Sequence, residues 1–248
     1  MKKFLQGIGL GIAIVLPGIS GGTAFIIYGF YHKFISDLSR MHLRPYLSLF
    51  AGTAIGIIAS SELIGLLLQA VPDLLVSFLL GALLASVRLV LPQRPKFTLM
   101  SVAAVCGGFS VAWFLSSEPL GSLQTVTNGS LLLYLIGGIL SSATMLLPGV
   151  SGSAVLVVMG LYDDVIFALN QLQFPKLFIL TCGWGIGLLG FARILSSLYR
   201  QHFQALSFLL AGLIIGSGKT LLPASISPGA FLAFAAGAIL VALFGGKE

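Results

Sequence analysis

Charged residues are scarce in this chain of 248 residues, of which only 8% are Asp, Glu, Lys or Arg. A soluble domain carries about 25% of these residues. Hydrophobic residues make up 57% of the sequence, and its mean hydropathy is +1.07. This balance excludes an ordinary soluble protein and predicts a polytopic membrane protein.

Cysteine and histidine are also rare, and their positions do not indicate a metal site. Cys106 and Cys182 fall in different apolar segments, where we expect small core residues and not a disulfide. The three histidines lie at the ends of apolar segments. Lys and Arg are scattered at segment ends too, which indicates membrane topology and excludes a nucleic-acid surface. We expect no cofactor, apart from a coupling proton or sodium ion.

Apolar segments run along the whole chain, and helix-breaking residues interrupt two of them. The segments span approximately 5–30, 46–70, 74–91, 97–115, 131–169, 177–199, 204–222 and 229–245. The first contains Pro17–Gly22 (PGISGG, the first tip), and the fifth contains Pro148–Ser153 (PGVSGS, the second tip). Proline removes a backbone N–H and glycine permits unusual backbone angles, so each tip predicts a broken membrane helix. The breaking residues are Pro17, Gly18, Pro148 and Gly149.

A shift of 131 positions aligns the two halves of the chain. The tips coincide under this shift, and so do several residues further on. Matching pairs include Gly29 and Gly160, Gly52 and Gly183, Gly56 and Gly187, Gly81 and Gly212, Ser86 and Ser217, and Arg88 and Lys219. We therefore expect a single membrane domain over residues 1–248 that arose by duplication, with repeat 1 at about 1–117 and repeat 2 at about 130–248.

The loop charges indicate how the repeats are oriented. If each tip belongs to a hairpin that returns to its own side of the membrane, most Lys and Arg share one face, and the loop 116–130 on the other face has none. The positive-inside rule makes the basic face, and both termini, cytoplasmic. Three spans per half is an odd number, so the second half is inverted. The predicted fold is an all-α inverted-topology repeat, each half having one re-entrant helical hairpin plus three transmembrane helices.

The helix that restarts after each tip predicts an anion site. Ser20 and Ser151 stand at N-cap positions, and the free N–H groups and dipole of a first helical turn bind anions. Inversion would point both restarted helices at one phosphate near the membrane midplane. The expected ligands are Ser20, Gly21, Gly22, Thr23, Ser151, Gly152 and Ser153. The plainer alternative is a Pro-Gly kink with small residues for packing, but two matching copies favour a transport site.

Ionisable residues within the apolar segments are further candidates, because charge in a membrane is costly and often functional. Arg193 is the preferred phosphate ligand on the cytoplasmic side, and Arg88 and Lys219 would serve one mouth each. The alternative for Arg88 and Lys219 is extension to the membrane interface. Glu62 is a candidate for proton coupling, or else a residue near a helix end.

At the tips the chain resembles the bacterial polyprenyl-phosphate transporters of the PopT type, formerly a domain of unknown function. The resemblance lies in the Pro-Gly-x-Ser-Gly-Gly-Thr run at 17–23, its second copy at 148–153, and the Gly-x-Tyr at 29–31 and 160–162. It extends over essentially the whole chain. Ser153 and Ala154 stand where the first copy has Gly22 and Thr23, so the two tips are expected to act unequally.

The resemblance implies that a multi-pass protein of the bacterial inner (cytoplasmic) membrane returns undecaprenyl phosphate from the outer to the inner leaflet. This recycling supports cell-wall polymer synthesis, and rocking of the two repeats would provide alternating access. The implied partners are a polyprenyl-phosphate lipid and the membrane. The oligomeric state is left open, a homo-oligomer included.

Two other functions stay open at this point. An ion-coupled secondary transporter of another anion would need a closed aqueous path in place of a lateral opening for a lipid tail. An intramembrane serine protease is suggested by Gly-x-Ser-Gly at 18–21 and 149–152. Its nucleophile would need a nearby base, and no histidine lies within an apolar span. We therefore do not expect an enzyme.

Overall fold

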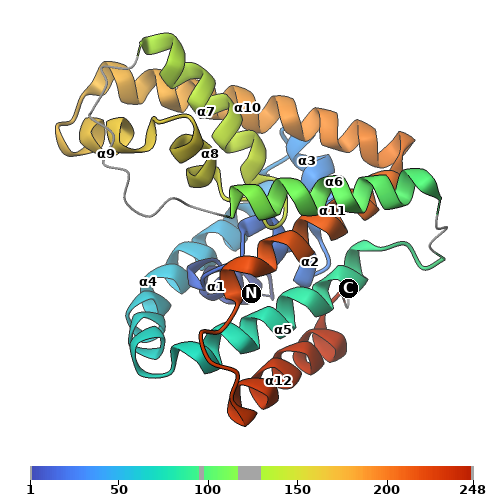
Figure 1. Cartoon of the computed structure of the whole chain (residues 1–248). Helices are drawn as coiled ribbons and strands as arrows, with labels where there is room; N and C mark the ends of the chain where they lie inside the picture. Colours follow the sequence, from blue (N-terminus) through green and yellow to red (C-terminus); the bar gives the residue numbers. More distant parts are fainter. Residues whose placement is uncertain (1, 95–97, 117–129, 247–248) are drawn as a thin grey trace.

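The computed structural model describes residues 2–94, 98–116 and 130–246, and within these ranges it is helical without strands (Figure 1). The first half contains α1 (Lys2–Val15), α2 (Gly21–Ile27), α3 (Tyr31–Ser39), η1 (Arg44–Tyr46), α4 (Leu47–Ala70), α5 (Pro72–Val90) and α6 (Leu99–Leu115). The second half contains α7 (Leu131–Met145), α8 (Gly152–Val158), α9 (Tyr162–Asn170), α10 (Phe174–Gln201), α11 (Phe203–Ser217), η2 (Gly218–Leu221) and α12 (Pro228–Phe244). Lys96, Lys247 and loop 117–129 lie outside the described residues.

The predicted class, an all-α polytopic membrane protein, is confirmed. Among the described residues, four stretches are long and apolar enough to cross a membrane, namely η1 with α4, α5, α10, and α11 with η2. The apolar pair α8 and α9 is bent by 107°, as a broken span or a re-entrant loop is. α6 and α12 have 17 residues each, about 25 Å at 1.5 Å per residue. Three spans per half and the inversion of the repeat therefore stay predictions.

Glycines allow the helices within each half to pack closely. α1 packs along α4, and α7 packs along α10 (Figure 1). A Cβ at Gly52 would collide with the carbonyl oxygen of Phe4, and a Cβ at Gly183 would collide with that of Leu135, which is 131 positions after Phe4. Only glycine fits such a contact, and these faces serve helix packing.

The remaining long helices pair across the two halves. α5 packs on α12, and α6 packs on α11, so that each half lends one helix to the other (Figure 1). Gly81 of α5 contacts the backbone of Phe234 in α12, and its counterpart Gly212 in α11 contacts that of Val105 in α6. The halves are therefore interlocked and do not simply lie side by side.

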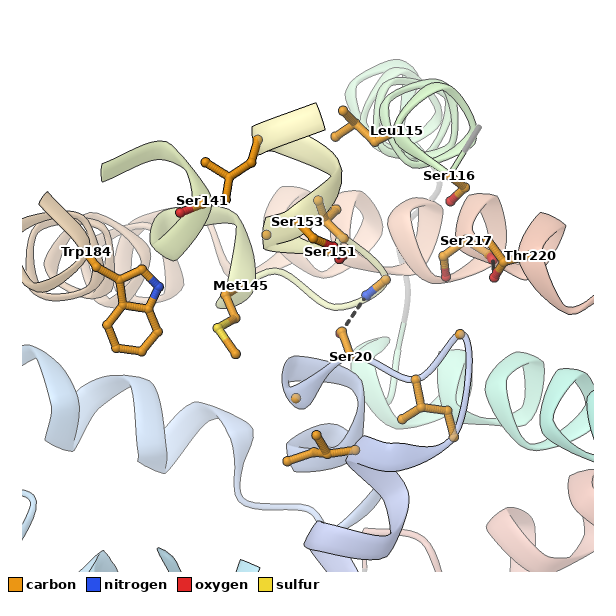
Figure 2. A pocket seen from close by; sticks show the side chains of 18 of the residues that line it. Ser20, Leu115, Ser116, Ser141, Met145, Ser151, Ser153, Trp184, Ser217 and Thr220 are labelled. Atoms are coloured by element: carbon orange, nitrogen blue, oxygen red, sulfur yellow. Dashed lines mark hydrogen bonds between the residues drawn. The ribbon is translucent and has the colours of Figure 1, made fainter. Parts of the chain in front are cut away.

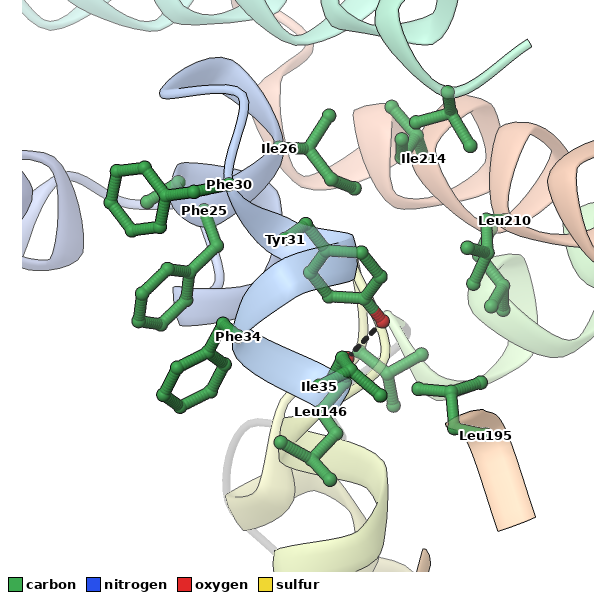
Figure 3. Packing of buried hydrophobic residues seen from close by; sticks show 14 of the residues in the cluster. Phe25, Ile26, Phe30, Tyr31, Phe34, Ile35, Leu146, Leu195, Leu210 and Ile214 are labelled. Atoms are coloured by element: carbon green, nitrogen blue, oxygen red, sulfur yellow. Dashed lines mark hydrogen bonds between the residues drawn. The ribbon is translucent and has the colours of Figure 1, made fainter. Parts of the chain in front are cut away.

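The core between the halves is built around the short helices α2 and α3 (Figure 3). The rings of Phe25 and Phe34 stack with centroids 4.2 Å apart, and Phe30 meets Phe25 edge to face. Ile214 of α11 and Leu195 of α10 close the same cluster from the second half. This apolar cluster fixes the return of the chain after the first tip.

The two cysteines do not belong to the core. Cys106 on α6 and Cys182 on α10 are both free and exposed on the protein surface. The expectation of small core residues was wrong, because a membrane helix carries apolar side chains on its lipid-facing side as well as on its packed side.

Candidate functional site

Each tip is a tight turn between two helices, and the turn depends on glycine. Gly18 has φ +74° and Gly149 has φ +76°, a left-handed conformation that costs other residues about 1–2 kcal/mol. α1 stops at Val15 and α2 begins only at Gly21. The second tip separates α7 from α8 in the same way.

The two tips meet in space. The backbone N–H of Gly149 in the second tip donates to the Oγ of Ser20 at 3.0 Å and to the Oγ1 of Thr23 at 3.1 Å (Figure 2). Ser20 Oγ also accepts the N–H of Thr23 at 3.2 Å, which makes Ser20 the side-chain cap of α2. One hydroxyl pair thus caps the first helix and holds the second tip.

Buried contacts of Tyr31 and Gly22 also hold the tips together. The Tyr31 hydroxyl donates to the carbonyl oxygen of Leu146 at 2.6 Å, and both residues are buried (Figure 3). A Cβ at Gly22 would lie 3.1 Å from that same oxygen and 3.1 Å from the nitrogen of Pro148. The first tip therefore packs closely against the chain that enters the second.

The second tip differs from the first as its sequence suggests. Ser151 occupies the N-cap position of α8, but its hydroxyl makes no capping hydrogen bond. It lies 2.6 Å from the Oγ of Ser153, and Ser151 is exposed. The first tip has glycine where Ser153 stands, so this hydroxyl pair exists only in the second tip. These two hydroxyls are free to face a ligand.

A cavity of about 730 Å³ lies against both tips (Figure 2). Its tip residues include Gly18, Ser20, Gly21, Ser151, Gly152 and Ser153. Further hydroxyls come from Ser116, Ser141, Thr181, Ser217 and Thr220. Apolar walls come from Ile14, Leu115, Met145, Leu156, Leu180 and Trp184. The site therefore combines many hydroxyl donors with an apolar surface, and none of the described residues that line it is charged.

The predicted ligands fall into two groups. Ser20, Gly21, Ser151, Gly152 and Ser153 line the cavity. Gly22, Thr23, Pro17 and Pro148 do not line it, and Thr23 is fully buried between the tips.

The structure places the ionisable candidates away from the cavity lining. Arg88 is exposed in the last turn of α5, and Glu62 is exposed on α4. Arg193 is exposed, and its Nε donates to the carbonyl oxygen of Ser39 at 3.4 Å. Lys219 Nζ lies 4.8 Å from the ring centroid of Trp113. Their roles in phosphate binding or proton coupling stay predictions.

Several cavity residues were not predicted, among them Ser141, Thr181, Trp184 and Thr220. A signal existed for Ser217, which coincides with Ser86 under the 131-position shift. Nothing in the sequence marks the others, because a lone Ser, Thr or Trp on a membrane helix is common and its facing direction depends on helix packing.

A helical membrane protein with two broken helices that meet at a hydroxyl-lined cavity is typical of transporters. The sequence matches the family described as undecaprenyl phosphate translocase-like over residues 45–233, and the chain belongs to this family.

Two curated relatives agree with this membership. The polyprenyl-phosphate transporter of Vibrio cholerae is 31% identical over 238 residues, covering 88% of this chain and 76% of the relative. The polyprenyl-phosphate transporter of Staphylococcus aureus is 28% identical over 242 residues, covering 87% of this chain and 83% of the relative. Both are named as transporters, which agrees with the expectation of a protein that is not an enzyme. No solved structure matches the chain.

Proposed function

We propose that this protein moves undecaprenyl phosphate from the outer to the inner leaflet of the bacterial cytoplasmic membrane by alternating access, with both termini cytoplasmic. It would thereby recycle the carrier lipid of cell-wall polymer synthesis. The observation that carries this proposal is the cavity at which the two tips meet. The names of the two relatives support the choice of substrate.

The hydroxyl groups suit a phosphate monoester. Its oxygens accept several hydrogen bonds, and the Ser151 and Ser153 hydroxyls stand at the second tip beside Ser141 (Figure 2). Among the described residues the lining carries no charged side chain, and binding to them by hydrogen bonds alone would leave the phosphate free to depart toward either leaflet. This is a useful property for a transported group.

The apolar wall suits an isoprenoid tail and disfavours a small anion. Trp184 of α10 lines the cavity, and its side chain is 40% exposed. Met145 and Trp184 lie on one side of the tips in Figure 2, and Ser217 and Thr220 lie on the other. A path past Trp184 toward the lipid would let a tail remain in the bilayer. A carrier of small anions has no need for such a wall.

The position of the cavity fits uptake from the outer leaflet. By the predicted topology, Ser116 after α6 and Thr220 in η2 lie at the external ends of their segments, and both line the cavity. On the other side of the tips, the Tyr31–Leu146 hydrogen bond and the Phe25 cluster fill the space. Movement of the phosphate inward would require the contact between Ser20 and Gly149 to open.

Neither tip serine contacts a base among the residues that the structure describes. Ser20 Oγ contacts Thr23 and the Gly149 backbone, and Ser151 Oγ contacts Ser153. No histidine, aspartate, glutamate or lysine is among the described residues that line the cavity. Within this part of the chain, a serine nucleophile at either tip has no neighbouring group to take its proton.

The test uses the purified protein in liposomes that contain a fluorescent short-chain polyprenyl phosphate. We expect protein-dependent exchange of this lipid between the leaflets, and no exchange of the matching polyprenyl alcohol. Inorganic phosphate uptake is measured in the same vesicles. Phosphate uptake without movement of the lipid would replace the proposal with a carrier of small anions, and movement of neither substrate would refute it.

A further inference from the structure

A second pocket, of about 380 Å³, lies at the start of α1 on the predicted cytoplasmic face. Its polar residues are Lys3, Gln6, Lys33, Asp37, His42 and Tyr46. Among the described residues, two lysines and a histidine thus surround a space with a single carboxylate. The pocket is separated from the tips by most of α1, which spans roughly 18 Å between Lys3 and Val15 at 1.5 Å per residue.

The contacts within this basic pocket leave cationic groups available for a ligand. Asp37 Oδ2 accepts the Tyr46 hydroxyl at 2.8 Å, and Lys3 Nζ donates to the carbonyl oxygen of Pro45 at 3.1 Å. The ammonium group of Lys3 also lies 5.5 Å from the ring centroid of Tyr46. Across the described ranges, the side chains of Lys33 and His42 have no hydrogen bond or ion pair.

The backbone places His42 at the pocket by a strained turn. Met41, with φ +57°, follows the end of α3, and the N–H of His42 donates to the carbonyl oxygen of Asp37 at 2.8 Å. The corresponding turn of the second half has Leu172 with φ +49°, and the N–H of Gln173 donates to the carbonyl oxygen of Ala168 at 2.8 Å. Both halves therefore have the same turn at this place.

The three corresponding positions in the second half carry no basic side chain. Under the 131-position shift, Tyr134, Asp164 and Gln173 replace Lys3, Lys33 and His42. Tyr134 is fully buried, and its hydroxyl donates to the carbonyl oxygen of Asp164 at 3.1 Å. Lys176 Nζ lies over the Tyr134 ring at 5.5 Å from its centroid. The fold itself does not require a basic pocket, and the positive-inside rule accounts for basic residues on this predicted cytoplasmic face but not for their gathering around one pocket.

We propose that the basic pocket binds a phosphate monoester at the cytoplasmic mouth of the protein. This inference rests on the proposed function, and it makes the pocket the receiving site for the head group after the phosphate has passed the tips. The described residues of the cavity hold the phosphate by hydrogen bonds, whereas Lys33 attracts its charge and His42 offers a further hydrogen-bonding group. The difference between the faces would favour occupancy on the cytoplasmic side.

The test exchanges the pocket residues for their counterparts. Lys33→Asp with His42→Gln places the residues of positions 164 and 173 into the first half. Binding of a prenyl phosphate with two isoprene units to the detergent-purified protein is measured by titration calorimetry. We expect two sites in the wild-type protein, and at least about tenfold weaker binding at one of them in the variant. Lys33→Arg should keep both sites, and Arg200→Gln, which changes an exposed cation outside the pocket, serves as the matched control.

The outcomes separate this inference from the proposed function. If the Asp variant does not fold, Lys33→Gln with His42→Gln replaces it. Equal binding by the pocket variant and the wild-type protein would overturn the inference alone, and absence of binding in the wild-type protein would overturn both. A parallel titration with inorganic phosphate shows whether the pocket recognises the phosphate group alone or the lipid as well. Binding of both ligands to the pocket means that the phosphate group suffices, and binding of prenyl phosphate alone means that the lipid is required.

Discussion

The Oγ of Ser20 accepts the backbone N–H of Gly149 at 3.0 Å, although 129 positions separate these residues in the sequence. This hydrogen bond joins the two tips at the edge of the cavity. It uses a side chain from one half and the backbone from the other. The two copies of the motif are therefore unequal partners in one site.

Ser20→Ala should destabilise the protein more than Ser151→Ala. The Ser20 hydroxyl accepts two N–H groups, whereas the Ser151 hydroxyl makes no capping bond. Loss of an N-cap costs about 1 kcal/mol, and the Gly149 N–H would keep only its hydrogen bond to the Oγ1 of Thr23. Thermal unfolding in detergent measures the difference. Equal shifts of the two midpoints would contradict the asymmetry of the tips.

Alanine at the two neighbouring glycines of α2 should have opposite effects. Gly21→Ala places its Cβ in open space at the first position of α2, so it should gain part of the roughly 1 kcal/mol difference in propensity of a helix interior. Gly22→Ala places its Cβ 3.1 Å from the Leu146 carbonyl oxygen and pushes the tips apart. We expect a higher unfolding temperature for the first variant and a lower one for the second. The prediction fails if both variants are stabilised.

Tyr31→Phe should lower the free energy of unfolding, because Tyr31 holds the first tip against the chain that enters the second. It removes the buried hydrogen bond to the Leu146 carbonyl oxygen, at a cost of about 1–2 kcal/mol. Tyr162 is the matched control, since it coincides with Tyr31 under the 131-position shift and is 39% exposed. Chemical unfolding in detergent should show a loss for Tyr31→Phe and little change for Tyr162→Phe. The reverse order would contradict this assignment.

The sequence predicted the positions of the helices well, because hydropathy and Pro-Gly breaks are local signals. The segment predicted at 46–70 corresponds to α4 at Leu47–Ala70, and the segment at 204–222 corresponds to α11 with η2. The sequence also marked the tips, which follow the ends of α1 and α7. The glycine pairs at 52 and 56 and at 183 and 187 marked faces that do pack closely.

The sequence could not predict which helices pack together or which side chains line the cavity. Membrane helices are apolar on all sides, so nothing in α5 indicates that it packs on α12 and not on α6. The contribution of Trp184 to the cavity depends on that packing. Intramembrane charge drew attention to Arg88 and Arg193, but charge does not reveal whether a side chain faces a cavity or the surface, and both are exposed.

The central claim is tested most directly by a double variant, Ser151→Ala with Ser153→Ala. The measurement is the rate at which this variant exchanges polyprenyl phosphate between the leaflets of a liposome. These hydroxyls face the cavity and bond each other, so their loss should leave the fold intact and slow exchange at least about tenfold. Ser61→Ala removes an exposed hydroxyl on α4 and should exchange the lipid like the wild-type protein. Slow exchange confined to the cavity variant is the predicted result. Exchange at the wild-type rate in a folded cavity variant would contradict the claim that the phosphate passes between the tips.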